Sequence, residues 1–212
     1  NGIGLFITGC MDQAIRVYDA VTQNLVLKLE GHTKGVISFS WTSTHKLVSG
    51  GWDGSARIWD LDLAGACLME LTGHENGVQV LGLPSGHILT TSTGESVNSK
   101  PANFQLRMWD PTDGEQLGES RRDHAGPIRS ICGIRNAAGD GTSEFATSSN
   151  DGSIRTYIIS SGASSEMEVS SNNDESKAGH LKGLSSDAIE PRSCVFHAPS
   201  GDDNSPPFVL GC

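Results

Sequence analysis

Apolar and polar residues alternate along the chain in short runs, and turn-forming residues separate these runs. In the run 36–41, Val36, Ser38 and Ser40 lie opposite Ile37, Phe39 and Trp41, and Leu25, Leu27 and Leu29 share one face of an earlier run. A period of two over short runs bounded by Gly, Asp, Asn and Pro predicts β-strands joined by tight turns. No stretch carries an apolar stripe of helical length. The pattern therefore predicts an all-β fold.

One group of landmarks recurs along the chain. Each copy has a short apolar run, a small residue, a turn and a closing aromatic residue, and the copies lie at 6–19, 47–60, 89–110 and 145–157. From Asp19 to Asp60 is 41 residues, and from Asp60 to Asp110 is 50. Polar insertions at 94–103 and 136–143 lengthen the later copies. Repeats near this length indicate stacked units, with about four short strands in each.

The landmarks resemble those of WD-repeat β-propeller blades. A Gly-His pair at 31–32 and 73–74, a Ser-Gly pair at 49–50, a turn aspartate and a closing Trp-Asp follow the order of that family. The resemblance covers residues 1–159 as a partial first blade and three further blades, and residues 193–212 as a partial next blade. It implies about four of an expected seven or so blades. We therefore expect this chain to be part of a larger propeller.

The resemblance also implies a buried structural tetrad of His32, Ser49, Asp53 and Trp59. Buried polar groups need partners, because each one left unpaired costs about 1–3 kcal/mol. The other repeats offer partial sets: Thr8, Asp12 and Tyr18; His74, Thr91 and Trp109, with Glu95 in place of Asp; and His124, Thr147, Asp151 and Tyr157.

The charge balance excludes some classes of partner. The 212 residues include 15 Lys and Arg against 25 Asp and Glu, which gives a formal net charge of -10. This balance argues against binding to nucleic acid or to anionic lipid, because both need clustered basic side chains. The five cysteines form no CxxC pair. They are typical of reduced thiols and predict a cytoplasmic or nuclear location.

Residues 160–192 differ from the repeats in composition. The segment is rich in serine and acidic residues and has almost no aromatic residue. This composition predicts a flexible insertion. The insertion is either a tolerated surface loop or a site of regulatory phosphorylation.

Catalytic motifs are missing from the sequence. There is no HExxH, GxSxG, P-loop or GxGxxG pattern, and no zinc-ligand spacing of Cys and His. His45, His87 and His197 stand in turn-like contexts that are typical of solvated side chains. We therefore predict a non-enzymatic protein without cofactor or metal.

The loops next to the tetrad landmarks form the predicted rim of the blades. Its candidate partner-binding residues are Met11, Thr33, Lys34, Trp52, Glu75, Asn76, Pro127 and Asn150. Trp52 lies one residue before a tight turn, where a large aromatic side chain is poorly placed for a core. An exposed tryptophan is a common interface anchor. The alternative is that Trp52 packs on neighbouring loops.

Several sequence segments are similar to one branch of the WD-repeat family. Residues 48–53, 67–74, 83–91 and 149–155 resemble the N-terminal propeller of proteins of the phospholipase-activating type, which are ubiquitin-fusion-degradation factors. The resemblance implies binding of ubiquitin or ubiquitylated proteins through Trp52, Met11 and Asn150. It implies engagement of an AAA+ segregase only through regions outside this chain. The alternative is a general scaffold or substrate receptor that reads a peptide partner.

Overall fold

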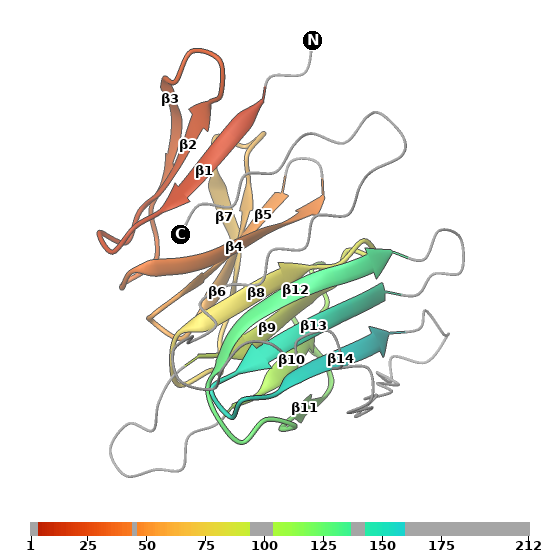
Figure 1. Cartoon of the computed structure of the whole chain (residues 1–212). Helices are drawn as coiled ribbons and strands as arrows, with labels where there is room; N and C mark the ends of the chain where they lie inside the picture. Colours follow the sequence, from red (N-terminus) through yellow and green to blue (C-terminus); the bar gives the residue numbers. More distant parts are fainter. Residues whose placement is uncertain (1–3, 44–45, 94–103, 137–142, 160–212) are drawn as a thin grey trace.

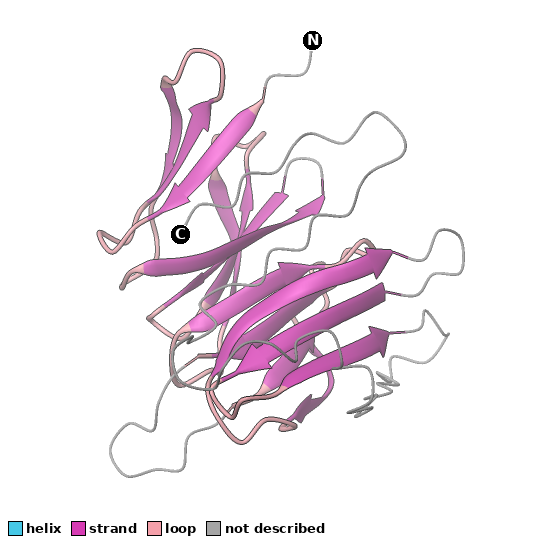
Figure 2. Cartoon of the chain, viewed as in Figure 1, coloured by secondary structure: helices cyan, strands magenta, loops and turns pink. Residues whose placement is uncertain are grey.

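The computed structural model describes residues 4–43, 46–93, 104–136 and 143–159, and every regular element in these ranges is a β-strand (Figure 2). The strands form four antiparallel sheets of consecutive strands. This confirms the all-β prediction. Among the described residues, no helix has the length and hydropathy that a membrane span requires. The predicted segments 160–192 and 193–212, and residues 94–103 and 137–142 of the two insertions, lie outside the described residues.

Each sheet is a meander, and we number the sheets blades 1 to 4 (Figure 1). Blade 1 contains β1 (Leu5–Gly9), β2 (Ile15–Asp19) and β3 (Leu25–Leu29). Blade 2 contains β4 (Val36–Ser43), β5 (Lys46–Gly51), β6 (Ala56–Asp60) and β7 (Ala66–Leu71). Blade 3 contains β8 (Val78–Gly82), β9 (Ile88–Ser92), β10 (Leu106–Trp109) and β11 (Gln116–Arg121). Blade 4 contains β12 (Ile128–Asn136), β13 (Ser143–Ser149) and β14 (Ile154–Ile159).

The blades pack face to face, and each layer of the hydrophobic core lies between two neighbours. Leu47 and Trp59 of blade 2 join Ile15 and Val17 of blade 1 in one cluster. Val48, the next residue on β5, points the other way and packs against blade 3. Alternation along a strand therefore supplies both faces of a blade with apolar side chains. A third cluster joins blades 3 and 4 in the same way.

The inner strands β4, β8 and β12 contact one another in chain order. The backbone N–H of Val80 donates to Ser38 Oγ at 3.1 Å, and that of Gly82 donates to Ser40 Oγ at 3.0 Å. Serine hydroxyls of β4 thus pair backbone donors on the edge of β8, which would otherwise lack partners. The arrangement is that of consecutive WD-repeat propeller blades.

Blades 2 and 3 approach so closely that side chains are excluded at two positions. A Cβ added at Gly50 would lie 2.1 Å from the carbonyl oxygen of Val78. A Cβ at Gly82 would lie 2.0 Å from the carbonyl oxygen of Trp41. Backbone therefore meets backbone at this interface, as glycine permits.

Candidate functional site

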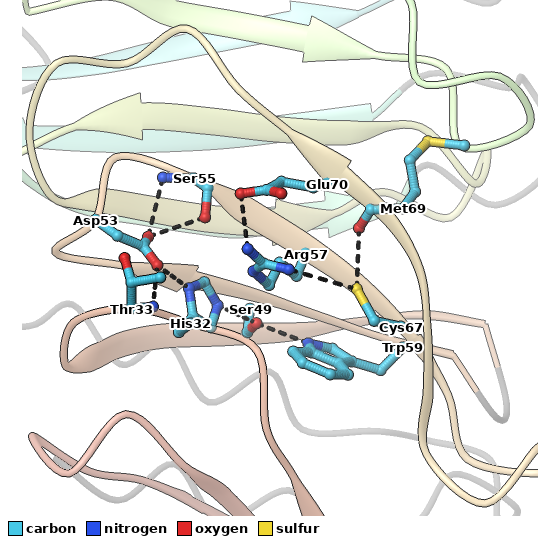
Figure 3. A network of polar contacts seen from close by, with 10 residues as sticks. All are labelled: His32, Thr33, Ser49, Asp53, Ser55, Arg57, Trp59, Cys67, Met69 and Glu70. Atoms are coloured by element: carbon cyan, nitrogen blue, oxygen red, sulfur yellow. Dashed lines mark hydrogen bonds and ion pairs between the residues drawn. The ribbon is translucent and has the colours of Figure 1, made fainter.

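Blade 2 contains a hydrogen-bonded chain of four side chains (Figure 3). His32 Nδ1 lies 2.9 Å from Asp53 Oδ2, and His32 Nε2 lies 2.8 Å from Ser49 Oγ. The indole Nε1–H of Trp59 donates to the same Ser49 hydroxyl at 2.8 Å. His32, Ser49 and Trp59 are all buried. The four residues grouped by the sequence thus join the loop before β4 to β5 and β6.

Asp53 fixes two loops to each other. Its Oδ2 accepts a bond from the backbone N–H of Thr33 at 2.8 Å, and its Oδ1 accepts bonds from the Ser55 N–H and hydroxyl. Burial acts to raise the pKa of Asp53, but the bonds from Thr33 and His32 outweigh it and lower the pKa to about 2. Burial lowers the pKa of His32, against the opposing effect of Asp53. The pair therefore contains an ionised carboxylate and a neutral imidazole near pH 7.

Blade 4 repeats the arrangement with Tyr in place of Trp. His124 Nδ1 lies 3.0 Å from Asp151 Oδ2, and His124 Nε2 lies 2.7 Å from Thr147 Oγ1. The N–H of Ala125 donates to Asp151 at 2.9 Å. Tyr157 occupies the register position of Trp59, and burial raises its pKa, although a hydrogen bond with Thr147 opposes the rise.

Blade 3 corrects one assignment made from the sequence. His74 Nε2 lies 2.7 Å from Thr90 Oγ1, and the Trp109 indole donates to Thr90 at 2.8 Å. The predicted hydroxyl, Thr91, is one residue out of register, so its side chain faces the other side of β9. The Thr91 Oγ1 and His74 Nδ1 atoms are buried without a hydrogen-bond partner among the described residues. Glu95 lies outside the described residues.

Blade 1 does not join its three candidate residues. Thr8 is exposed. Asp12 instead forms an ion pair with Arg16 at 2.5 Å, and its Oδ1 accepts a bond from the backbone of Ala14 at 3.2 Å. Tyr18 stacks on Phe6 with ring centroids 4.8 Å apart. The prediction of a network here was wrong, because the described part of blade 1 supplies no histidine to link these side chains.

The rim holds two exposed apolar side chains in adjacent blades. Met11 is 69% exposed and Trp52 is 38% exposed. A Cβ at Gly35 would lie 2.5 Å from Met11 Sδ, and the backbone N–H of Trp52 donates to the Gly35 carbonyl at 2.8 Å. Gly35 therefore contacts the side chain of Met11 and the backbone of Trp52. We call the surface formed by Met11 and Trp52 the rim strip.

Trp52 was interpreted either as an exposed interface anchor or as a side chain packed on neighbouring loops, and each interpretation describes one part of the ring. The ring lies over Gly77 of blade 3, where an added Cβ would approach Trp52 Cε3 to 2.6 Å and Cζ3 to 2.8 Å. Packing on a neighbouring loop therefore covers part of the ring, while the rest faces solvent.

The other rim candidates occupy the loops before β4, β8 and β12 and the turn after β13. Thr33, Lys34, Glu75 and Asn150 are exposed, whereas Asn76 and Pro127 are half-buried. Asn150 Oδ1 accepts a bond from Arg129 Nε at 3.0 Å. Its backbone N–H donates to the Pro127 carbonyl at 3.0 Å, as that of Trp52 does to Gly35. The same backbone hydrogen bond therefore joins the equivalent loop and turn in blades 2 and 4.

Sequence reasoning missed Gly35, Gly77 and Thr93, which support the rim strip. The Thr93 N–H and hydroxyl donate to the Gly77 carbonyl at 2.7 and 2.9 Å. A signal was present, because a glycine stands three residues after both His32 and His74. Within the described ranges, no group of three or more His, Cys, Asp or Glu side chains could hold a metal ion.

Comparison with known families supports the assignment of the sheets as WD-repeat blades. The family model described as "WD domain, G-beta repeat" matches residues 23–60, which extend from just before β3 to the end of β6. This segment is similar to a WD repeat. It contains the complete tetrad of blade 2, and its boundaries cross from blade 1 into blade 2. The chain therefore carries WD-repeat blades, which are generally protein-interaction modules without catalysis.

Three relatives show the breadth of the similarity. The chain is 39% identical over 75 residues to "Cell division control protein 4" of Saccharomyces cerevisiae and 33% identical over 92 residues to "Protein Notchless" of Drosophila melanogaster. It is 36% identical over 75 residues to "Phospholipase A-2-activating protein" of Xenopus laevis. The matches cover 35%, 41% and 35% of this chain but only 10%, 17% and 9% of those proteins.

Proposed function

We propose that the chain binds a protein partner through the rim strip, and that this partner is ubiquitin or a ubiquitylated protein. The observation that carries the proposal is a pair of exposed apolar residues on adjacent blades: the Met11 side chain packs on Gly35, and the Trp52 backbone N–H donates to the Gly35 carbonyl. Partly exposed tryptophan is enriched among the residues that dominate binding energy. A folded domain with an apolar surface patch fits such a strip.

Ubiquitin is the first candidate because the resemblance of the sequence to propellers of the phospholipase-activating type implies it, and one relative carries that name. Binding to one ubiquitin would be weak, and a ubiquitin chain would strengthen it through avidity. This function is consistent with a cytoplasmic or nuclear location. The AAA+ segregase stays an expectation of the family resemblance, since no described residue is assigned to it.

The test is a titration of ¹⁵N-labelled ubiquitin with the full chain, followed by NMR. We expect chemical-shift changes confined to the apolar patch of ubiquitin, and we expect Trp52→Ala to weaken binding about tenfold or more. Val21→Ala is a matched control, because Val21 is 83% exposed but lies in the β2–β3 turn, at the opposite end of blade 1 from Met11. A change of less than twofold for Trp52→Ala would contradict the role of the strip.

The second candidate is a scaffold that reads a different protein or peptide. Two relatives with unrelated names are 39% and 33% identical to the chain, close to the identity of the phospholipase-activating protein. The similarities therefore favour a general scaffold as much as a ubiquitin-binding protein. An absence of ubiquitin shifts at millimolar concentration would select the scaffold function.

A further inference from the structure

Two glycines lie directly beneath the rim strip. Gly35 borders Met11, and Gly77 borders Trp52; both glycines are buried. In each case the apolar side chain comes from one blade and the glycine from the next blade. Each side chain therefore crosses a blade boundary and rests on backbone that has no Cβ.

We infer that Gly35 and Gly77 are positioning residues that set the height and direction of Met11 and Trp52 for partner binding. This inference rests on the proposed function of the rim strip. Neither glycine needs to touch the partner. Each leaves open the space that the side chain above it occupies, so a methyl group at either position would move the binding surface.

Gly77 has the stricter requirement of the two. Its carbonyl accepts two bonds from Thr93, at 2.7 Å from N and 2.9 Å from Oγ1, which fix the backbone. A Cβ at Gly77 would lie 2.6 Å from Thr93 Oγ1 and 2.6 Å from Trp52 Cε3. Contacts this short require movement. The Thr93 N–H holds the backbone, so the Thr93 hydroxyl and the rigid indole ring are the groups that must rotate away.

Gly35 has a weaker requirement, because methionine is flexible. A Cβ there would lie 2.5 Å from Met11 Sδ and 3.1 Å from Met11 Cα. The thioether can change rotamer at low cost. We therefore expect Gly35→Ala to redirect Met11 with a smaller effect on binding than Gly77→Ala has through Trp52.

The first test examines the free protein. In ¹H–¹⁵N NMR spectra of the full chain, the Trp52 indole N–H is assigned by its loss in Trp52→Phe. Gly77→Ala should shift this signal, while the signals of the buried Trp59 and Trp109 stay in place. Gly133→Ala is the matched control, because a Cβ at Gly133 meets nothing within 4 Å. An unchanged Trp52 signal in Gly77→Ala would overturn the inference.

The second test is a double-mutant cycle read by ubiquitin binding. Gly77→Ala should weaken binding about tenfold in the chain with Trp52, but by less than about twofold when Trp52 is already alanine. Equal losses in both backgrounds would show a general structural role and overturn the inference. If ubiquitin does not bind at all, the proposed partner fails, while the indole signal still decides the role of Gly77.

Discussion

Blades 2 and 3 bury the same histidine, hydroxyl and indole, but blade 2 closes the network with a carboxylate and the described part of blade 3 does not. In blade 2, Asp53 pairs with His32 and holds the neighbouring loop through Thr33. In blade 3, His74 binds Thr90, but its Nδ1 atom is buried without a partner. The hydroxyl–indole half of the network is therefore separable from the carboxylate half.

The difference also appears in how each blade secures its rim loop. Asp53 ties the loop before β4 to the β5–β6 turn. Thr93 ties the loop before β8 instead, through its two bonds to the Gly77 carbonyl. The second arrangement uses neutral groups and places its support directly under Trp52. Blade 3 thus has a fixed rim loop without a paired charge in the described network.

Among the variants that test the difference between blades 2 and 3, we expect Asp53→Ala to have the largest effect on stability. The change leaves the buried His32 Nδ1 and the Thr33 N–H without their acceptor, and it should lower the free energy of unfolding by about 3 kcal/mol. Asp60→Ala is the control, since Asp60 accepts backbone bonds only within an exposed turn, and we expect a loss of about 1 kcal/mol or less. Urea unfolding measures both. Equal losses would contradict the special role of Asp53.

A second, smaller effect is expected from acidification. Burial and then the Arg107 guanidinium lower the pKa of His74 from 6.5 to about 3. The unfolded chain therefore binds a proton at His74 between these values, whereas the folded chain does not, so stability falls as the pH falls below 6.5. Between pH 7 and pH 5 this histidine alone should cost about 2 kcal/mol.

The measurement is urea unfolding at pH 7, 6 and 5, for the original chain and for His74→Gln. Burial also lowers the pKa of His32 and His124, but the carboxylates of Asp53 and Asp151 oppose it there. We therefore expect the pH dependence to decrease markedly in His74→Gln. The same dependence in both proteins would show that His74 protonates in the folded state.

The all-β fold and much of the tetrad chemistry were predictable from local pattern. Alternation over short runs identified the strands, and a turn aspartate at a fixed distance from the closing aromatic residue marked the sets in blades 2 and 4. This spacing rule fails in blade 3, because residues 90–93 all carry hydroxyls and an insertion separates them from Trp109. Sheet register is needed to choose Thr90, which stands two residues beyond the partner of Trp109, as Ser49 does beyond the partner of Trp59.

The support of the rim strip could not be predicted in the same way. Gly35 and Gly77 act on side chains of the preceding blade, Met11 and Trp52, so their common distance from His32 and His74 marks the glycines but not the side chains that they support. Only the packing of one blade on the next brings these residues together. Contacts between repeats are therefore the feature of this molecule that is hardest to predict from a single sequence.

A charge difference on the outer strands separates blades 2 and 3 as well. In blade 2, Arg57 forms an ion pair with Glu70 at 2.7 Å (Figure 3). In blade 3, Arg107 occupies the equivalent position on β10, and within the described ranges no carboxylate pairs with it at ion-pair distance. Burial and then the nearby Arg122 lower the pKa of Arg107. Arg107 donates instead to Gln105 Oε1 and to the Gly73 carbonyl, both neutral groups, where Arg57 pairs with an acid.

The smallest effect that we expect comes from supplying the missing acid. Leu106 pairs with Arg121 as Ala56 pairs with Leu71, and the β10–β11 register shifts between Leu106 and Met108. We therefore choose Ser120, the residue before Arg121, as the counterpart of Glu70. Ser120→Glu should raise the free energy of unfolding by about 0.5 kcal/mol at low salt, and 1 M salt should remove most of the gain. Ser120→Gln, which has the same length without the charge, should gain nothing. An equal gain for both variants would mean that packing on β11, rather than the charge opposite Arg107, distinguishes the outer strands of the two blades.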